Sequence, residues 1–515
     1  MTRASTLWLR AIVRCSIRLS GGMAIGLLAA SVVGATPGDT PLVEAVKSGD
    51  IQAVRTLVGR KVDVNQRAAD GATALHWAAH HEHLAAVDVL LRAGAKPDTV
   101  NALSVTPLWI AADLGSSAIV ARLLAAGADP NVAPQTGGTA LMLASRNGDV
   151  SSVKLLLEHG ANVNAAEQAN GQTALMWGVS QRQPDVVSLL IRAGAEVNAR
   201  SKQLKRVVLL CCPTWPGDPE GTVEIDQGGL TPLLFAALTG DAGIARRLID
   251  AGANVDETAA AGTTALAMAA MRGFTELVSL LLERGANPDA GGGGFTALHA
   301  AVLRGDAKMV DALLAHRASV NARLTKGTFL KRGSREYAFD KFLVGATPFL
   351  IAARLGDLAL MRRLADAGAD ISIRLEDGRT PLMIAVQGEA SGAGGRVRGG
   401  AAEPRVLEAT KLLLSLGSDV ESTDSGGNRA LHLLAKRRPG FNSVIQLLAQ
   451  HGAKLEPVNS KGETPLVLAL APPAPLKGQS TTVQTVQWRA EYDAWVENKG
   501  RTATVDLLRK LGATR

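Results

Sequence analysis

Aromatic residues and cysteines are scarce in this sequence. Only 3% of its 515 residues are aromatic, and only three are cysteines. Two of these, Cys211 and Cys212, are adjacent, so no disulfide framework holds the fold together, and they lack the C-x-x-C spacing of a redox motif or a zinc clip. We expect these two cysteines to lie in a loop without a functional role; a strained vicinal disulfide or a reactive thiol is the alternative.

Recognised catalytic motifs are also lacking. The sequence contains no G-x-S-x-G elbow, no H-E-x-x-H, no phosphate-binding loop, and no G-x-G-x-x-G between a strand and a helix. The four glycines of Gly291–Gly294 are not followed by Lys and Ser/Thr at phosphate-loop spacing, so they indicate a turn. We therefore predict a protein that is not an enzyme and holds neither a cofactor nor a metal.

No apolar run is long enough to span a bilayer comfortably. The longest lies near the N-terminus, from Met23 to Val33, after four arginines and before the small residues Val33-Gly34-Ala35. This pattern predicts a secretory signal over residues 1–35, and hence a periplasmic or secreted protein of residues 36–515 without a membrane span. An uncleaved membrane anchor is the alternative.

The charge of the chain is only mildly basic. The formal net charge is +8, and removal of residues 1–35 takes away four of the 55 basic residues and no acidic one, which leaves +4. Such a charge argues against the large electrostatic footprint of a nucleic-acid-binding protein.

One pattern recurs from Pro37 to Arg515. In the copy Gly262–Gly294, Thr264 can cap a helix, Gly273 interrupts the apolar pattern, and Gly285 suits the left-handed end of a second helix. Turn residues follow and lead into the next copy. Successive helix starts, from Thr40 to Thr464, are separated by 33, 33, 33, 34, 58, 33, 32, 51, 33, 49 and 35 residues.

This pattern resembles the ankyrin repeat, with the T-P-L-H-x-A signature in the form Thr296-Ala297-Leu298-His299-Ala300-Ala301 and a recurring Gly-Ala-Asn/Asp turn. The resemblance implies an all-α ankyrin-repeat solenoid of about twelve repeats, each with two helices and a finger loop, in one elongated domain. Three copies depart from the pattern. Arg429 replaces the capping Thr, Arg317 replaces the glycine after the second helix, and Ser418 replaces the Ala after Gly417.

Extra residues interrupt the period at four places, near residues 201–228, 324–344, 388–404 and 471–500. We expect the first to form an extended hairpin and the third a mobile loop. The second combines basic residues with aromatics such as Phe329 and Tyr337. The fourth places Trp488, Tyr492 and Trp495 on one helix face, which we expect to cover the end of the stack rather than bind a ligand.

In ankyrin proteins the concave helix ends and the fingers carry recognition, so the resemblance implies where a partner would bind. The residue after the motif histidine, as in Trp77, is expected in the core. The two residues after the Ala-Ala pair vary freely, and for His80 and His81 a surface contact is favoured over a metal. The candidate partner-binding residues are His80, His81, Asp113, Arg146, Leu238, Met271, Arg272, Leu303, Arg304 and Arg354, together with Phe329 and Tyr337.

Among these candidates, Leu238, Met271 and Leu303 form an expected exposed apolar strip with a basic margin, between the first two insertions. We predict that repeats six to nine bind an amphipathic helix or an extended peptide with acidic flanks. The predicted function is a monomeric, non-catalytic scaffold that binds a protein or peptide partner along the concave groove and finger loops. The alternative is a binder of nucleic acid or an anionic surface through the basic, aromatic insertion.

Overall fold

The computed structural model describes residues 40–135, 137–209, 222–326, 343–387, 403–436, 441–471 and 502–514. The segment 1–35, predicted as a signal, lies outside these residues. Across the described ranges, no helix combines the length and the apolar character that a membrane crossing requires. Contacts group the chain into two compact units, one with residues up to Leu204 and Gln227–Ala260, the other with Lys205–Asp226 and Ala261 onward.

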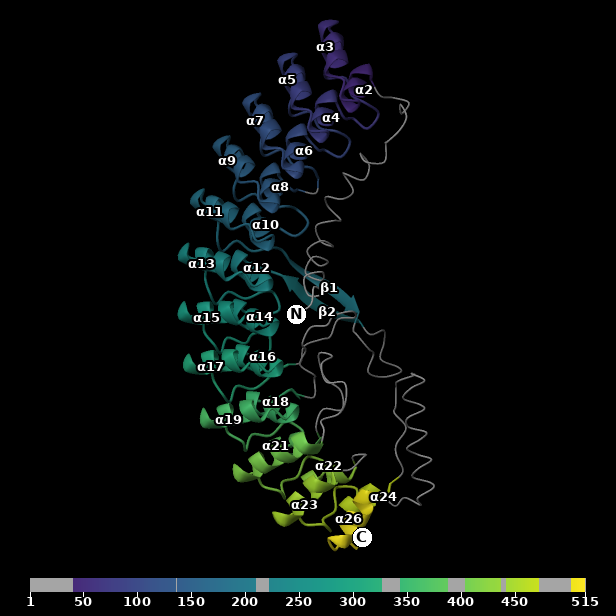
Figure 1. The fold of residues 1–515 in the computed structure, drawn as a ribbon, viewed down its shortest axis with the longest axis vertical. Helices are drawn as coiled ribbons and strands as arrows, with labels where there is room; N and C mark the ends of the chain where they lie inside the picture. The colour runs from purple at the N-terminus through teal and green to yellow at the C-terminus, as the bar shows by residue number, and fades with distance from the viewer. Residues whose placement is uncertain are drawn as a thin grey trace. The chain divides into compact units, whose positions relative to one another are not determined.

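The first unit is a stack of helix pairs in two layers (Figure 1). The first helices of its six pairs are α2 (Pro41–Lys47), α4 (Ala74–His80), α6 (Pro107–Leu114), α8 (Ala140–Asn147), α10 (Ala174–Ser180) and α12 (Pro232–Thr239). The second helices are α3 (Ile51–Gly59), α5 (Leu84–Arg92), α7 (Ser117–Ala125), α9 (Val150–Glu158), α11 (Pro184–Arg192) and α13 (Ala242–Asp250).

The second unit also contains six helix pairs in its described residues. Their first helices are α14 (Ala265–Arg272), α16 (Ala297–Arg304), α18 (Pro348–Leu355), α20 (Pro381–Gln387), α22 (Ala430–Ala435) and α24 (Pro465–Leu470). Their second helices are α15 (Thr275–Glu283), α17 (Ala307–Ala315), α19 (Leu358–Asp366), α21 (Glu403–Ser415), α23 (Asn442–Gln450) and α26 (Ala503–Lys510). The prediction of an all-α ankyrin-repeat fold with about twelve repeats is confirmed.

Each first helix begins at the predicted capping residue. Thr264 Oγ1 accepts a hydrogen bond from Ala267 N at 3.2 Å, which satisfies one of the free N–H groups at the start of α14. Thr106 does the same for Trp109 N at 3.1 Å, and Pro107 occupies the first helical position, where a missing N–H is harmless. The repeated Thr-Pro and Thr-Ala pairs therefore fix where the first helices start.

The second helices have their own start and stop signals. Asp149 Oδ1 accepts a hydrogen bond from Ser152 N at 3.0 Å at the start of α9, and Asp306 Oδ1 accepts one from Met309 N at 3.0 Å at the start of α17. Beyond the end of α15, Gly285 has the predicted left-handed conformation with φ of 84°.

Apolar side chains from both helices of each pair form the core. The column predicted to be buried is confirmed at Trp77, Ile110, Leu143, Trp177, Phe235, Ala300 and Ile351, which are all at most 7% exposed. Met268, in the same column, is only half-buried. The column therefore provides stacking contacts, and none of its residues can be assigned to binding on the basis of the repeat pattern alone.

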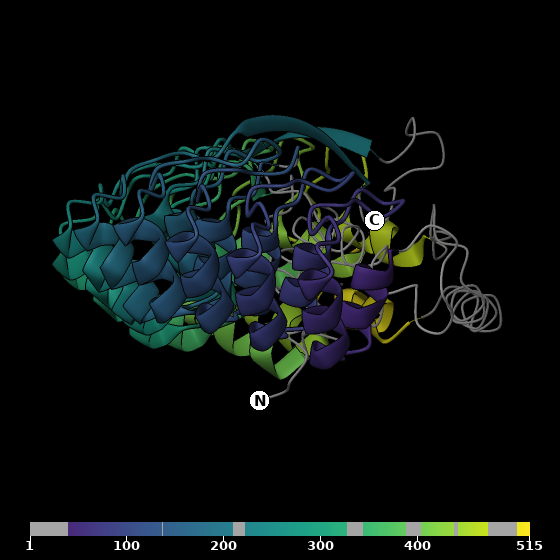
Figure 2. The same cartoon turned by 90° about the horizontal axis from the view of Figure 1, so that it is seen from above.

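The finger loops of the first unit gather on one side of its helix layers (Figure 2). An asparagine ties each of several fingers to the following repeat. Asn164 Nδ2 donates to Gly194 O at 3.2 Å, and Asn164 Oδ1 accepts from Glu196 N at 2.8 Å. Asn65 and Asn131 make the same pair of bonds earlier in the chain.

Adjacent fingers also approach each other closely through glycines. In the second unit, Gly262 has φ of 80°, and a Cβ atom on it would lie 2.6 Å from the carbonyl carbon of Gly292. A Cβ atom on Gly293 would lie 2.7 Å from Thr263 Oγ1. The run Gly291–Gly294 was predicted to be a turn, and close packing of two fingers explains why it contains so many glycines.

The extra residues leave the links between repeats intact. Asn198 precedes the first insertion, and it still donates to Gly252 O at 3.0 Å and accepts from Asn254 N at 2.9 Å. In the second unit, Asn321 precedes the second insertion and donates to Gly368 O at 3.3 Å. The third and fourth insertions separate two helices that pack together, α20 with α21 and α24 with α26.

Two of the departures from the repeat pattern are tolerated locally. At Arg429, which cannot cap like threonine, the backbone N–H donates to His432 Nδ1 at 3.3 Å, so α22 still starts at the expected place. Arg317 adopts the left-handed conformation of the glycine it replaces, with φ of 64°. A side chain in this region is strained, so Arg317 destabilises its turn slightly.

Candidate interaction surface

Exposure of the first helices begins where their sequences start to vary. In α6, the segment Pro107–Ala112 is buried, Asp113 is half-buried, and Leu114 is 39% exposed. The same change occurs at the two residues after the Ala-Ala pair in most first helices from α4 to α18. We call these two residues of each repeat the helix-end positions; they include all the candidate binding residues except Phe329 and Tyr337.

In the first unit, two of the candidates form an ion pair. Arg146 Nη2 lies 2.6 Å from Asp113 Oδ1, and their side chains are 22% and 7% exposed. Asn147 Nδ2 donates to Asp113 O at 2.7 Å, and the Arg146 guanidinium lies 5.8 Å from the centre of the Trp177 ring. Asp113 and Arg146 thus neutralise each other between neighbouring repeats, which reduces the charge available to a partner.

His80 and His81 belong to an aromatic cluster at the end of α4. The ring of His81 stacks on Trp77 at 5.8 Å and on His83 at 5.6 Å, while His80 meets His81 edge-on at 5.1 Å. Lys47 Nζ lies 3.9 Å from the centre of the Trp77 ring. Burial lowers the pKa of His80, and burial together with the nearby His80, His83 and Lys47 lowers the pKa of His81. These histidines therefore stay neutral to a lower pH than free histidine.

The described geometry of the cluster does not suit a metal ion. His81 stacks on its neighbours, and His83 Nδ1 lies 3.0 Å from Val46 O, so that nitrogen is engaged with the backbone. In the part of the chain that the structure describes, no group of three or more His, Cys, Asp or Glu side chains has an arrangement that could hold a metal ion.

Leu238, the remaining candidate of the first unit, is half-buried at the end of α12. The next residue, Thr239, is buried, and its carbonyl oxygen accepts a hydrogen bond from Arg182 Nη2. Only one of the two helix-end positions of this repeat is therefore within reach of a partner.

In the second unit, Met271, Arg272, Arg304 and Arg354 are half-buried at the ends of α14, α16 and α18. Arg304 Nη1 donates to Met271 O at 3.0 Å, which links two consecutive repeats. The expectation that Leu303 is exposed was wrong, because α16 packs between α14 and α18 and leaves this side chain 7% exposed.

Sequence reasoning assigned the motif histidines to the repeat but missed what they do. Thr73 N donates to His76 Nδ1 at 3.0 Å, and His76 Nε2 lies 3.0 Å from Val105 O, at the start of the next repeat. His299 makes the same two contacts. Burial lowers the pKa of both histidines to about 4, so both are neutral at pH 7.

Trp109 takes the place of this histidine in its own repeat. Its Nε1 donates to Gly138 O at 2.7 Å, and Gly138, like Val105, directly precedes a capping threonine. In the sequence, the signal for this linking role was the shared position of the three residues, each three residues after a capping threonine. All three side chains connect one repeat to the next, so none of them is a candidate for binding.

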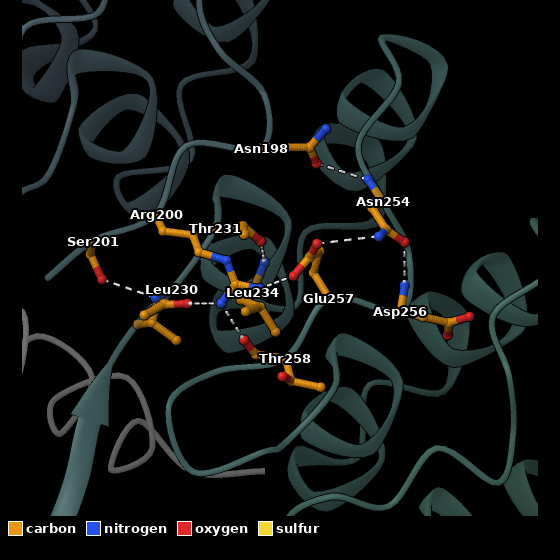
Figure 3. A network of polar contacts seen from close by, with 11 residues as sticks. Asn198, Arg200, Ser201, Leu230, Thr231, Leu234, Asn254, Asp256, Glu257 and Thr258 are labelled. Carbon is orange, nitrogen blue, oxygen red and sulfur yellow. Dashed lines mark hydrogen bonds and ion pairs between the residues drawn. The ribbon is translucent and has the colours of Figure 1, made fainter. Parts of the chain in front are cut away.

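A polar network holds the base of the first insertion (Figure 3). Arg200 forms an ion pair with Glu257 and donates from Nη1 to Thr258 O at 2.9 Å, which ties the finger to the following one. Ser201 N donates to Leu230 O at 3.0 Å, and Leu230 N donates to Ser201 Oγ at 2.9 Å. The two ends of the insertion are thus held together beside the fingers.

The predicted hairpin in this insertion is confirmed. Strands β1 (Gln203–Leu209) and β2 (Thr222–Gly228) form a two-stranded sheet. Lys205 Nζ lies 2.9 Å from Glu224 Oε1, and this hydrogen bond, with the charges of Glu224 and Asp226, raises the pKa of Lys205. Val207 is 64% exposed, the highest value for a large apolar residue in the described segments.

Several predictions fall on residues outside the described ranges. They concern Cys211 and Cys212, the aromatic candidates Phe329 and Tyr337, the loop between α20 and α21, and the helix expected around Trp488. These stay predictions.

Among known protein families, the model for ankyrin repeats matches this chain in three copies. The copies match residues 24–101, 108–201 and 233–323, which together make up just over half of the chain. The first copy begins within the apolar run that was predicted to belong to the signal.

Similar proteins include the human ankyrin repeat domain-containing protein 63, which is 34% identical over 130 residues, or 25% of this chain and 30% of that protein. Human SH3 and multiple ankyrin repeat domains protein 2 is 37% identical over 79 residues, 15% of this chain and 4% of that protein. The phosphocholine transferase AnkX of Legionella pneumophila is 25% identical over 171 residues, 32% of this chain and 16% of that protein. The chain thus spans less than a third of each relative.

Among solved structures, the ankyrin repeat domain of human ASB11 is similar with a TM-score of 0.38 and 27% identity, covering 48% of this chain and 100% of that domain. The family match agrees with the helix pairs, capping threonines and finger loops described above. On the family match alone, the chain belongs to the ankyrin-repeat family.

Proposed function

We propose that this protein is a non-catalytic scaffold that binds a protein partner through helix-end positions and finger loops. Ankyrin repeats generally mediate protein–protein interactions, and their fold is typically a non-catalytic scaffold. One observation carries the proposal. The first helices are buried at most positions where their sequence repeats, and most of them become half-buried or exposed at the helix-end positions, where the sequence varies from one repeat to the next. Variation at accessible positions is what recognition requires.

Within the second unit, we place the contact at Met271, Arg272, Arg304 and Arg354. These half-buried side chains come from three successive first helices and combine one apolar residue with three cations. Such a surface suits an amphipathic helix or an extended segment with acidic flanks, in which Met and Arg act as anchors. Leu303 is too buried to contribute much contact area, and Leu238 remains a proposed contact of the first unit.

We also propose that the protein is exported by the signal at residues 1–35 and acts in the periplasm or outside the cell. The arginines before a short apolar run and the small residues near Ala35 support this proposal. Mass spectrometry of the chain purified from its own source tests it. A mature N-terminus near Ala35 is expected, whereas an intact N-terminus would indicate an anchor.

A charge reversal at Arg354 tests the binding surface directly. The native extract would be cross-linked to the mature chain, to Arg354→Glu, and to Arg362→Glu as a control on α19 of the same repeat, where the side chain is exposed. We expect one specific partner to be lost with Arg354→Glu and retained with Arg362→Glu, with equal circular dichroism spectra for both variants. Equal recovery with both variants would contradict the placement.

The dependence of binding on salt concentration distinguishes this function from nucleic-acid binding. Binding to phosphates weakens steeply as the salt concentration rises, because each neutralised phosphate releases counterions. Contact through Met271 and the arginine stems should persist at salt concentrations that abolish phosphate binding. A steep salt dependence, together with recovery of nucleic acid, would favour the alternative.

A further inference from the structure

The aromatic cluster at the end of α4 carries polar atoms that form no hydrogen bonds. His80 and His81 contact Trp77 and each other through their rings, but within the described residues none of their ring nitrogens has a hydrogen-bond partner. Trp77 Nε1 is buried and also unpaired in that part of the chain. By contrast, both ring nitrogens of His76 in the same helix are bonded. The cluster therefore has hydrogen-bonding groups that the fold does not use.

The charged groups that act on His81 are basic. His80, His83 and Lys47, together with burial, lower the pKa of His81. Lys47 comes from α2 of the preceding repeat, and its Nζ lies 3.9 Å from the centre of the Trp77 ring. A carboxylate is the kind of group that would complement this cluster.

The acidic residues of the neighbouring elements do not fill this role. Helix α4 packs against α2, α5 and α6. Asp88 of α5 and Asp113 of α6 are already paired with arginines. Glu44 of α2 and Glu82, in the turn after α4, are exposed, and neither shifts the pKa of either histidine. The missing carboxylate must therefore come from another molecule.

We infer that His80 and His81, held in place by Trp77, bind an acidic side chain of the protein partner, and that binding takes up a proton. Both rings are neutral at pH 7 in the free chain. A carboxylate beside them favours the charged imidazolium, whose N–H then donates a charge-assisted hydrogen bond to it. The affinity should therefore be highest at low pH and should fall as the pH rises through the pKa of the bound histidine.

The inference rests on the proposed function, because it gives the chemistry of one part of the partner. It concerns helix-end positions of the first unit, and it does not depend on the contact proposed for the second unit.

A second tryptophan in the same column shows that the histidines define the site. Trp177 Nε1 is also buried and unpaired within the described ranges. The helix-end residues that follow it are Ser180 and Gln181, and the cation beside its ring, Arg146, is already paired with Asp113. A buried tryptophan by itself therefore does not provide a place for a carboxylate.

The test uses the full chain and a tetrapeptide of glutamate with blocked ends, labelled with tetramethylrhodamine. It would be titrated by fluorescence anisotropy at pH 5.5 and pH 7.5, with EDTA present to exclude metal-mediated binding. We expect binding about fivefold or more tighter at pH 5.5, and we expect His80→Gln combined with His81→Gln to abolish this difference. His159→Gln, which changes an exposed histidine after α9, should keep the difference.

A permanent charge separates proton uptake from the shape of the site. His81→Lys should bind the glutamate peptide at pH 7.5 about as tightly as the intact chain does at pH 5.5, because its charge does not depend on titration in this range. Absence of binding, equal binding of the intact chain at both pH values, or equal binding of a glutamine tetrapeptide would overturn the inference. A pH difference that survives in the double variant would overturn it as well.

The native partner distinguishes this inference from the proposed function. Cross-linking that loses the partner with Arg354→Glu, but recovers it equally from the intact chain at both pH values, would support the function and contradict the inference. The expected peptide result, together with unchanged partner recovery with Arg354→Glu, would support the inference and contradict the placement in the second unit.

Discussion

The step from Asn164 to Gly194 and the step from Asn198 to Gly252 join consecutive repeats, but only the second contains an insertion. Both asparagines donate to the glycine after the next second helix, at 3.2 and 3.0 Å, and both accept a backbone N–H, at 2.8 and 2.9 Å. The separation between successive helix starts is 34 residues across the first step and 58 residues across the second. The contacts of the two asparagines are nevertheless the same. Stacking and the insertion are therefore physically separate.

The difference shows where this family can change without losing its fold. Besides the apolar core, stacking depends on a few positions per repeat, namely the capping threonine, the residue three positions later, the finger glycine and the asparagine. Residues outside these positions can vary with less effect on stacking, although some of them, such as Asp113, Arg146 and Arg304, also contact a neighbouring repeat. We assign recognition to the helix-end positions because most of them are half-buried or exposed.

The largest expected effect comes from breaking the contact between two fingers. Gly262→Ala would combine a left-handed backbone with a Cβ atom 2.6 Å from Gly292, so we expect a loss of about 3 kcal/mol. Gly285→Ala is the matched control, because φ there is 84° and nothing lies within 4 Å of its Cβ atom. It should cost about 1 kcal/mol. Equal losses in urea unfolding would show that finger packing contributes nothing.

Acid should weaken the links that the motif histidines make between repeats. The pKa of His76 and of His299 is lowered to about 4, so the unfolded state binds more protons between pH 4 and 6.5. The contribution of these two histidines to the free energy of unfolding is therefore fully present above pH 6.5, and it falls as the pH decreases. At pH 5 each histidine should cost about 2 kcal/mol relative to pH 7.5.

The control for this pH effect is His316, an exposed histidine on the far end of α17. Urea unfolding at pH 5 and pH 7.5 would be compared for His76→Gln, His299→Gln and His316→Gln. The first two variants should lose part of the pH dependence, and the third should keep it. A pH dependence that survives both core substitutions would refute the assignment.

The comparison between plain and interrupted steps is tested by removing the two asparagines in turn. Asn164→Ala and Asn198→Ala should each cost about 1 kcal/mol, because each removes one side chain that both donates and accepts a hydrogen bond. The two losses should agree within a few tenths of a kcal/mol if the insertion leaves stacking unchanged. A much smaller loss for Asn198→Ala would show that the insertion loosens its step.

The smallest expected effect is a gain in stability. Arg317 has φ of 64° where most other repeats have glycine, so Arg317→Gly should relieve strain and stabilise the second unit by about 0.5 kcal/mol after the greater freedom of the unfolded chain is counted. Arg317→Lys, which keeps the strain, should change little. Destabilisation by Arg317→Gly would mean that the arginine side chain contributes contacts of its own.

The sequence predicted what depends on residues close together in the chain. Thr264 as a cap, Gly285 as a left-handed stop and the hairpin around Lys205 all follow from local chemistry. Exposure was harder to predict, because the burial of Leu303 depends on helices packed on both sides of α16. The ion pair of Asp113 with Arg146 was missed as well. These residues are 33 positions apart, which is one repeat, so comparison of equivalent positions would have suggested it.

Excision of the hairpin tests the separation of stacking from the insertion most directly. Removal of residues 203–227 restores the 33-residue spacing between Thr173 and Thr231 and keeps Asn198, Arg200 and Ser201. Urea unfolding of the excised chain should have the same midpoint as that of the intact chain. A midpoint lower by an amount equivalent to more than about 1 kcal/mol would contradict the account.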